Sequence, residues 1–385
     1  MGESAAQSVW VVANTTWYVF NFRSRLIREL LKKGYRVTVL SPADEYVDRV
    51  RALGARHIHL ELDNGGTNPF RDIPCLVRLI RLFHEENPNA LLTFTPKVNI
   101  YCSLAARLAG IPAVANISGL GTGFIRGGWL TTIIKFLYRL SLRHPTTVFF
   151  QNEDDSLLFV KEGLVPISAV KLLPGSGVDV DRFIPQSRAS EEGSFVFLVA
   201  ARLLRDKGIG EYVEAARLLK REFPSAEFRI LGFLDAKNPT AISTQQVAAW
   251  ESEGVVRYLG ATDDVVPHYA AADCVVLPSY REGTPRSLLE AGSMGKPIIT
   301  TNVPGCRQVV EDGRTGFLCR VRDHLDLAEK MRHILTLSED SRLRMGREGR
   351  EKMVREFDER FVIDKYLEVI ENILASGQAP KLRMG

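Results

Sequence analysis

Short apolar runs rich in β-branched residues alternate with helical patterns along almost the whole chain, and this alternation limits the fold more than any other feature. Helices are expected near 22–33, 46–53 and 98–109. Apolar strands separated by helices are typical of a parallel sheet that is covered on both faces. In the first half, the strand-like runs are 8–13, 35–42, 57–62, 90–94, 112–118, 146–152 and 170–179. We therefore expect an α/β fold.

The same rhythm restarts after a polar segment, which indicates a second domain of the same class. Its strand-like runs are 194–203, 227–232, 255–260, 273–279, 297–301 and 315–319. The chain has 385 residues, enough for two domains of about 150–200 residues each. We predict two Rossmann-like doubly wound domains that face each other across a cleft, a common place for ligands.

The predicted boundaries follow the polar segment and the last helical pattern. Residues 1–183 form the N-terminal domain, 184–193 the linker and 194–357 the C-terminal domain. Residues 358–385 contain a final helix, near 358–374, that we expect to pack back across the domain junction. Its packed face is expected to carry Phe361, Tyr366, Leu367, Ile370 and Leu374.

Composition narrows the class of partner. The five cysteines are scattered without a C-x-x-C pair, which favours a reduced, cytoplasmic setting. We find no signal-peptide layout and no apolar stretch of the ~20 residues that span a bilayer. No Asp or Glu lies between Asn87 and Asn152, so this stretch favours an anionic partner. No RNA-binding motif accompanies the basic residues, and nucleic acid is not expected.

Nucleotide-binding motifs of other doubly wound folds are missing. The turn after the first strand reads NTTWYVFNF, without the G-x-G-x-x-G of dinucleotide-binding proteins, and there is no P-loop. The segment REGTPRSLLEAGSMGKP (281–297) instead places Glu282 before a helix and Glu290 inside it. Thr284 is expected to cap this helix and Pro285 to lie in its first turn. The backbone donors of Gly283 and Thr284 would then suit a phosphate.

Two cations fall near the same place. Arg202 and Lys207 follow the first strand of the second domain, at the edge of the sheet where such folds bind ligands. Glu290 lies on an apolar, small-residue segment, where an unpaired charge is costly, so a hydroxyl-bearing ligand is an attractive partner for it. Two cations, a helix terminus and a diol-binding carboxylate together indicate a nucleoside diphosphate site. Glu282 would bind the group on the far phosphate.

This combination of R-x4-K, E-G-x-P-x4-E and a following G-K-P resembles glycosyltransferase family 4, retaining enzymes of the GT-B fold. The resemblance covers nearly the whole chain and is strongest to bacterial transferases that extend undecaprenyl-diphosphate-linked sugars. It implies a UDP-sugar donor such as UDP-N-acetylgalactosamine, a polyprenyl-diphosphate-linked acceptor and no metal cofactor. The product would be a glycan for protein N-glycosylation, O-antigen or capsule. The enzyme would work at the inner face of the cell membrane.

The resemblance also implies roles for the residues of the second domain. Arg202 and Lys207 neutralise the diphosphate leaving group and, with Glu282, form the catalytic set. Glu282 binds a hydroxyl of the donor sugar, and Glu290 binds the ribose hydroxyls. Fixed cations strengthen as negative charge grows on the departing phosphate, so this assignment makes chemical sense.

In the first domain the resemblance is less specific. Many relatives place a histidine after the strand 112–118, whereas this chain has Asn116, Ser118 and Gly119 there. Lys97, in a T-P-K sequence that starts a helix, is a candidate for the acceptor diphosphate. The predicted acceptor contacts are Asn21, Arg23, Lys97, Asn116 and Gly119.

The segment 126–144 has two interpretations. Lys135, Arg139 and Arg143 recur every fourth residue, beside a different, apolar face. An ordinary amphipathic helix packed on its own domain explains this pattern. A helix in the membrane interface, with Trp129 at the boundary and the three cations on anionic headgroups, explains it equally well.

One acidic motif and the predicted activity each have an alternative interpretation. The D-x-D at 179–181 is expected to cap a turn rather than to hold metal. A UDP-N-acetylglucosamine epimerase on the same fold and a non-catalytic nucleotide-sugar-binding protein remain alternatives to a transferase. The spacing of the second-domain motif argues against the epimerase, and intact Arg202, Lys207, Glu282 and Glu290 argue against a non-catalytic protein.

Overall fold

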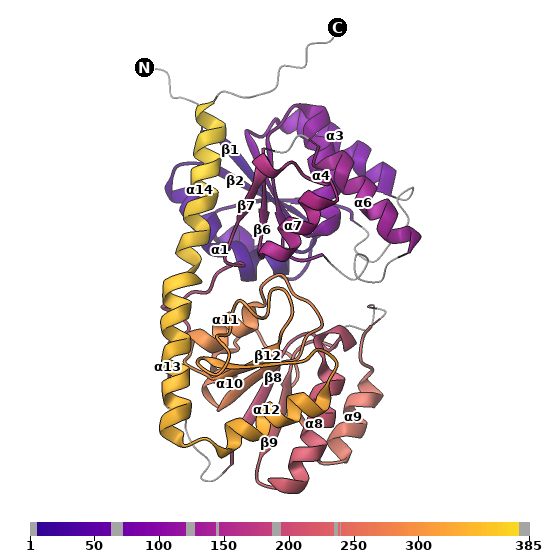
Figure 1. Ribbon diagram of the computed structural model, residues 1–385. Helices are drawn as coiled ribbons and strands as arrows, with labels where there is room; N and C mark the ends of the chain where they lie inside the picture. Colours follow the sequence, from indigo (N-terminus) through magenta and orange to yellow (C-terminus); the bar gives the residue numbers. More distant parts are fainter. Residues whose placement is uncertain are drawn as a thin grey trace. The chain divides into compact units, whose positions relative to one another are not determined.

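The computed structural model describes residues 6–62, 72–120, 128–143, 146–186, 194–234, 238 and 240–376, except for the side chain of Trp129. The chain divides into two compact units (Figure 1). The first contains residues 1–176 and 360–385, and the second contains residues 177–359.

The first unit is built on a parallel sheet with the strand order β3-β2-β1-β4-β5-β6-β7 in the described residues. Each strand matches one of the apolar runs expected from the sequence, so the predicted α/β class is confirmed here. The strands are β1 (Ser8–Val12), β2 (Arg36–Ser41), β3 (Arg56–His59), β4 (Ala90–Phe94), β5 (Ala113–Ile117), β6 (Thr147–Phe150) and β7 (Val170–Leu172).

Helices cover both faces of this sheet. Neighbouring strand residues point to opposite faces, so each strand contributes to two separate hydrophobic clusters. In β1, Trp10 belongs to one hydrophobic cluster and Val11 to another. The Trp10 cluster includes residues of α3 (Ile73–Glu86), α4 (Pro96–Ala109), α6 (Trp129–Ser141) and α7 (Glu153–Lys161). The Val11 cluster includes residues of α1 (Thr16–Lys32), α2 (Val47–Ala52) and α14 (Glu359–Ala375).

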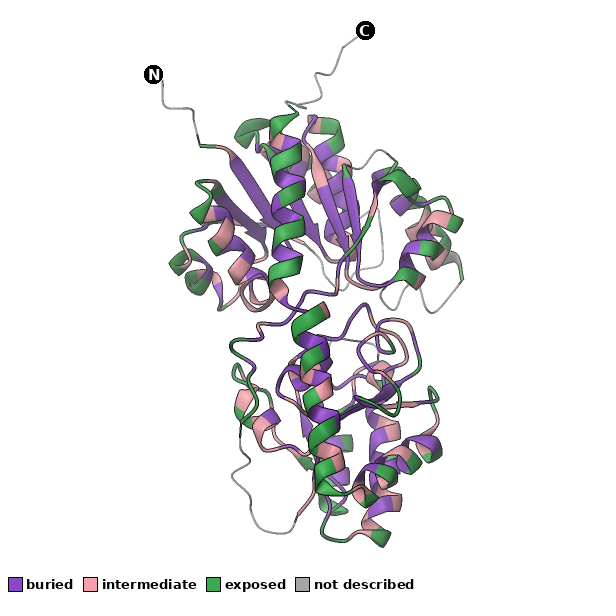
Figure 2. Cartoon of the chain, turned by 60° about the vertical axis from the view of Figure 1, so that its left-hand side comes forward, coloured by how far each residue is buried: buried purple, intermediate pink, exposed green. Residues whose placement is uncertain are grey.

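The second unit has a parallel sheet of the order β10-β9-β8-β11-β12-β13 in its described residues, so it too is doubly wound. Figure 2 shows both sheets as buried. The strands are β8 (Val196–Ala200), β9 (Glu227–Leu231), β10 (Arg257–Tyr258), β11 (Cys274–Leu277), β12 (Ile298–Thr301) and β13 (Gly316–Cys319). The helices are α8 (Ile209–Glu222), α9 (Thr244–Ser252), α10 (Val266–Ala270), α11 (Arg286–Ser293), α12 (His324–Thr336) and α13 (Glu339–Glu356).

Two local expectations differ from the structure. Helix α1 begins at Thr16 rather than near residue 22, because Thr15 is its N-cap and accepts a hydrogen bond from the backbone N–H of Tyr18. Phe361 is 42% exposed and does not lie on the packed face of α14. The buried face is instead formed by Val362, Ile363, Tyr366, Leu367, Val369, Ile370 and Ile373, which follow the helical period more closely.

The unit boundary also differs from the expected one. Residues 177–183 lie in the second unit rather than at the end of the first. The reason is packing: Val178, Val180 and Phe183 are buried in the core of the second unit. Asp179 caps the turn there, since its Oδ1 accepts from the backbone N–H of Asp181 and Arg182. The predicted turn-capping role of the D-x-D motif is therefore confirmed.

Candidate active site

Two short segments at the carboxyl edge of the second sheet bring the predicted donor residues together. The 3-10 turn η3 (Arg205–Lys207) follows β8, and the loop 278–285 follows β11, the neighbouring strand. The carbonyl oxygen of Asp206 accepts hydrogen bonds from the backbone N–H of Tyr280 at 2.9 Å and from Ser279 Oγ at 3.0 Å. These bonds fix the two segments against each other.

Lys207 and Glu282, predicted from separate motifs, form an ion pair at this edge. Lys207 Nζ donates to Glu282 Oε1, and the two side chains are only 20% and 12% exposed. A largely buried pair of this kind is costly to separate without new partners for both charges. The structure thus places the predicted phosphate-binding cation and the predicted sugar-binding carboxylate in direct contact.

Two close backbone approaches hold the loop that carries Glu282. Gly208 caps the N-terminus of α8 with φ +72°, and a Cβ there would lie 2.1 Å from the carbonyl oxygen of Pro278. Gly305 has φ +81°, and a Cβ there would lie 2.2 Å from the carbonyl oxygen of Gly283. The backbone N–H of Glu282 also donates to the carbonyl oxygen of Pro304. Only glycine meets both demands at these positions.

The helix after this loop begins one residue later than expected. Pro285 is the N-cap of α11, no side chain caps the helix, and its first helical residue is Arg286. The expectation that Thr284 caps α11 is therefore wrong; the pyrrolidine ring restricts φ, and Pro285 instead occupies the extended conformation of an N-cap. Gly283 and Thr284 are buried immediately before the helix.

Glu290 is largely buried, with 12% of its side chain exposed, but its charge has partners. Arg286 Nε donates to Oε1 at 2.9 Å, and the Tyr269 hydroxyl donates to Oε2 at 3.2 Å. Burial raises the pKa of Glu290, and Arg286 opposes this shift. The sequence analysis treated the carboxylate of Glu290 as unpaired within the protein, and that expectation is wrong. The i, i+4 spacing of Arg286 and Glu290 was a visible signal for the pair, whereas Tyr269 is distant in sequence.

Arg202 lies between β8 and η3, and its side chain is exposed. It is therefore on the same edge of the sheet as Lys207, because both follow the same strand.

In the first unit, Lys97 is held by a carboxylate that the sequence analysis missed. Lys97 Nζ lies 3.0 Å from Asp72, whose side chain is 5% exposed, and the Tyr101 hydroxyl donates to Asp72 Oδ2 at 2.9 Å. Burial and this hydrogen bond raise the pKa of Tyr101. Lys97 lies in the first turn of α4, so its cation and the helix N-terminus reinforce each other.

Two of the predicted acceptor residues serve the core of the first unit. Arg23 is 2% exposed, donates to the Tyr18 hydroxyl at 3.0 Å and lies over the ring of Phe94. Asn116 is 0% exposed, and its Nδ2 donates to the Tyr366 hydroxyl of α14. We therefore do not propose that Arg23 or Asn116 contacts a ligand.

Asn21 and Gly119 are the remaining predicted acceptor contacts. Asn21 lies in α1 and donates from Nδ2 to the carbonyl oxygen of Trp17 at 3.0 Å. Gly119 follows β5 with φ +136°, a conformation that favours glycine. Both remain predictions as ligand contacts.

Helix α6 uses two of its predicted headgroup-binding cations within the first unit. Lys135 Nζ lies 3.0 Å from Glu162, and Arg139 donates to the carbonyl oxygens of Glu162 and Gly163 at 2.7 and 3.2 Å. Arg139 therefore binds the C-terminal end of α7, where a cation is favourable. Arg143 is exposed. No helix within the described ranges has the length and apolar character needed to cross a membrane.

Two protein-family models match the chain, one in each unit. The model described as "Glycosyl transferases group 1" matches residues 180–352, and the model described as "Glycosyl transferase 4-like" matches residues 8–152. Together these matches span most of the chain. HepE from Anabaena, solved with UDP and glucose, superposes with a TM-score of 0.77 at 17% identity, covering 94% of this chain and 99% of that one.

Two bacterial sequences are also similar. An N,N'-diacetylbacillosaminyl-diphospho-undecaprenol alpha-1,3-N-acetylgalactosaminyltransferase from Campylobacter jejuni is 29% identical, over 92% of this chain and 96% of its own. A UDP-Gal:alpha-D-GlcNAc-diphosphoundecaprenol alpha-1,3-galactosyltransferase from Escherichia coli is 26% identical, over 78% and 81%.

The two-domain fold is that of the GT-B class, and the family matches show that the chain is a sugar-transferring enzyme. Within this class, the second unit matches the group 1 glycosyl transferases and the first unit matches the glycosyl transferase 4-like family.

Proposed function

We propose that this enzyme transfers an N-acetylhexosamine, such as N-acetylgalactosamine, from a UDP-sugar to a polyprenyl-diphosphate-linked saccharide with retention of configuration. The observation that carries the proposal is the Lys207–Glu282 pair beside the N-terminus of α11. The names of the Campylobacter and Escherichia relatives support the lipid-linked acceptor. The product would be a bacterial glycan for protein N-glycosylation, O-antigen or capsule.

Donor binding would redistribute the partners of the ion pair. The diphosphate brings negative charge to Lys207, so the ammonium can leave Glu282 for a phosphate oxygen. Glu282 is then available to accept a hydrogen bond from a hydroxyl of the donor sugar. Arg202, exposed on the same edge, would reach the diphosphate as a second cation. One binding event would thus position both ends of the donor.

The partners of Glu290 are compatible with ribose binding. A carboxylate has about four lone-pair sites, and Arg286 and Tyr269 occupy one on each oxygen. One site on each oxygen remains for the two ribose hydroxyls. Arg286 and Tyr269 would then orient the carboxylate before the nucleotide binds, which lowers the entropy cost of binding.

The chemical step follows from this arrangement. The bond between the anomeric carbon and the β-phosphate oxygen breaks, and its electron pair moves to the phosphate. The acceptor hydroxyl oxygen forms the new bond to the anomeric carbon on the same face, and its proton passes to the departing phosphate. Lys207 and Arg202 stabilise the charge that grows on that phosphate, which is why they contribute to the transition state more than to the ground state.

Replacement of Lys207 tests the proposal. Lys207→Ala should reduce turnover by about a hundredfold or more, because a preorganised cation at the leaving group is lost. Turnover is measured as UDP release and as product mass, using a panel of UDP- and GDP-sugars with a lipid-diphosphate-linked N-acetylglucosamine acceptor. Lys220→Ala is the matched control, since Lys220 lies in the last turn of α8, away from the donor residues, and donates to the carbonyl oxygen of Pro224. Near-normal turnover in Lys207→Ala would defeat the assignment.

For the acceptor we propose the N-terminus of α4 in the first unit. Lys97 is 22% exposed and is fixed by Asp72, so the pair is oriented but reachable. A diphosphate suits this position for two reasons, because the lysine ammonium and the helix N-terminus both favour negative charge. Lys97→Ala should raise the KM of the lipid-linked acceptor and leave the KM of the UDP-sugar unchanged. An equal change in both would contradict an acceptor role.

We also propose a peripheral contact with the inner face of the cell membrane through α6. Phe136 is 60% exposed and Leu140 is 37% exposed, and both lie beside Arg139 and Arg143 along a surface cavity of about 510 Å³. Apolar side chains flanked by arginines suit an anionic bilayer surface. Phe136→Asp should weaken sedimentation with phosphatidylglycerol vesicles.

The control for this experiment is Leu157→Asp in α7, because Leu157 is 65% exposed and does not line that cavity. Equal sedimentation of both variants and the unmodified protein would refute the contact. Binding to phosphatidylcholine vesicles alone would refute the role of the arginines.

A further inference from the structure

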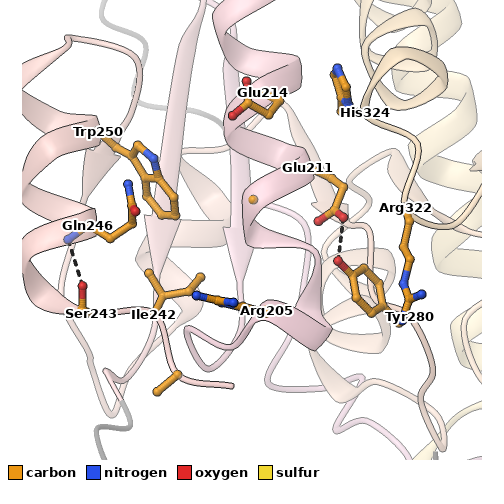
Figure 3. Close-up of a pocket in the computed structure, with 12 residues that line it drawn as sticks. Arg205, Glu211, Glu214, Ile242, Ser243, Gln246, Trp250, Tyr280, Arg322 and His324 are labelled. Carbon is orange, nitrogen blue, oxygen red and sulfur yellow. Dashed lines mark hydrogen bonds between the residues drawn. The ribbon is translucent and has the colours of Figure 1, made fainter. Parts of the chain in front are cut away.

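A second cavity, of about 400 Å³, lies in the second unit at the N-terminal ends of α8, α9 and α12 (Figure 3). This volume is within the range of about 300–1,000 Å³ that small-molecule sites have. None of its lining residues belongs to the proposed donor site. The side chains that matter for its chemistry are Arg205, Glu211, Glu214, Trp250, Tyr280 and Arg322.

The charges around this cavity are mixed, and this limits the class of ligand. Glu211 and Glu214 would repel a phosphate, while Arg205 and Arg322 would repel an ammonium group. Arginine only donates hydrogen bonds, and a carboxylate only accepts them. A hydroxyl group does both, so a neutral polyhydroxylated ligand can satisfy both kinds of side chain.

Aromatic side chains also line the cavity. The buried Trp250 lines one side of the cavity, and Tyr280 lines another (Figure 3). Aromatic rings provide large apolar surfaces with a polar edge, which suits a ligand that has apolar C–H faces as well as hydroxyl groups. A pyranose ring has both features.

The wall around Tyr280 is fixed by its own contacts. The Tyr280 hydroxyl donates to Glu211 Oε1 at 2.6 Å, and the guanidinium of Arg322 lies 4.6 Å from the centre of the Tyr280 ring. Arg322 adopts φ +60°, a conformation that is unfavourable for a residue with a side chain. Strained residues of this kind cluster at ligand sites. The cation–π contact helps to hold Arg322 in this conformation.

Gly210 keeps the cavity open from the side of α8. It is the second residue of the helix, where glycine is less favourable than alanine. A Cβ built on Gly210 would meet nothing within 4 Å. Packing therefore does not require glycine at this position, and its missing side chain leaves space that a ligand can use.

The cavity is separate from the donor site but is connected to it through the same two segments. Turn η3 carries Arg205 to the cavity and Lys207 to the donor site. The loop after β11 likewise carries Tyr280 to the cavity and Glu282 to the donor site. A ligand in the cavity would therefore contact the segments that hold the Lys207–Glu282 pair.

We propose that this cavity is a saccharide-binding subsite, distinct from the donor site, that accepts a pyranose ring through Glu211, Glu214 and the two arginines. The ring can belong to a free saccharide or to the glycan of a lipid-linked substrate, because the recognised chemistry is the same. This inference goes beyond the proposed function, since binding requires no transfer reaction.

The test is a titration of the full chain with the methyl glycosides of N-acetylglucosamine, N-acetylgalactosamine and galactose, followed by saturation-transfer NMR. We expect at least one glycoside to bind, and Gly210→Gln to weaken its binding about tenfold or more by occupying the cavity. Glu214→Gln should weaken binding as well. The control is Glu222→Gln, at the other end of α8, which should leave binding unchanged.

Folding and donor binding are checked in the same samples. Glutamine is a better helix former than glycine, so Gly210→Gln should not lower Tm. UDP affinity should be the same in all variants. If Gly210→Gln also raises the KM of the lipid-linked acceptor, the ring comes from the lipid-linked glycan. If it abolishes glycoside binding but leaves that KM unchanged, the ring comes from a free saccharide.

Several results would overturn the subsite. They are the absence of binding by all three glycosides, equal binding by Gly210→Gln, or displacement of the glycoside by the UDP-sugar, which would place it in the donor site. Binding of inorganic phosphate, weakened by Gly210→Gln, would show an anion site instead. A normal turnover of Lys207→Ala would refute the transferase assignment without affecting this titration.

Discussion

Substitution of Gly305 by alanine tests whether the loop of Glu282 must be held in place by its neighbour. The added Cβ would lie 2.2 Å from the carbonyl oxygen of Gly283 and 2.5 Å from that of Glu282, whereas ordinary contacts begin at 3.4 Å. The two loops must therefore separate by about 1 Å. A displacement of this size at a catalytic group can reduce the rate about a hundredfold.

The same substitution has a second cost, which a control variant can isolate. Alanine in a left-handed conformation costs ~1–2 kcal/mol irrespective of its neighbours. Gly313 has φ +75° and nothing within 4 Å of its would-be Cβ, so Gly313→Ala carries this cost alone. The difference in the free energy of unfolding between the two variants then measures the clash at Gly305.

The assay combines urea unfolding with UDP release in the presence of the lipid-linked acceptor. We expect kcat/KM for the UDP-sugar to fall about a hundredfold in Gly305→Ala and to stay within a factor of about two in Gly313→Ala. Full activity of Gly305→Ala at an unchanged Tm would refute the reasoning. Inactivity of Gly313→Ala would refute it too, because the loss would then not depend on the contact with Gly283.

Three further predictions concern other parts of the chain. Burial raises the pKa of Glu290, so the folded state favours the protonated carboxyl group. This group therefore stabilises the folded state below its ordinary pKa of 4.5, and the stabilisation is lost as the pH rises through the raised pKa. The Tm of the unmodified protein should therefore fall relative to that of Glu290→Gln as the pH rises through this window, and a constant difference in Tm would contradict the shift. Tyr366→Phe removes the acceptor of Asn116 Nδ2 in the core and should cost about 1–3 kcal/mol in urea unfolding, so unchanged stability would show that the bond contributes nothing. Activity should persist after treatment with EDTA, and a loss that Mg²⁺ restores would show that the reaction needs a metal.

The order of strands and helices was predictable because each apolar run had the length and composition of a strand. The residues at which helices begin, and the helix faces that are buried, were harder to predict. Thr15, which caps α1, stands in a stretch that looks like a turn, and the face of α14 was assigned from Phe361, which is exposed. A pattern of apolar residues gives the period of a helix, but only the packed core decides which of two adjacent apolar residues is buried.

The candidate site was predictable where a motif is local in sequence. Glu282 and Glu290 belong to one motif, and the edge of the sheet could be inferred for Lys207. The contact of Lys207 with Glu282 depends on the adjacency of β8 and β11, and that of Glu290 with Tyr269 depends on tertiary packing. Buried Arg23 and Asn116 were assigned to a ligand because burial cannot be read from a motif.

The assignment of α14 to the first unit has a consequence for how the chain folds during synthesis. Tyr366, Ile370 and their neighbours fill one face of a sheet whose strands all precede residue 173. On the ribosome, that face must wait for the whole of residues 177–359 to be made before its covering helix arrives. The second unit, which is continuous in sequence, can mature first, and the earlier-made unit is the one exposed to proteases and chaperones for longer.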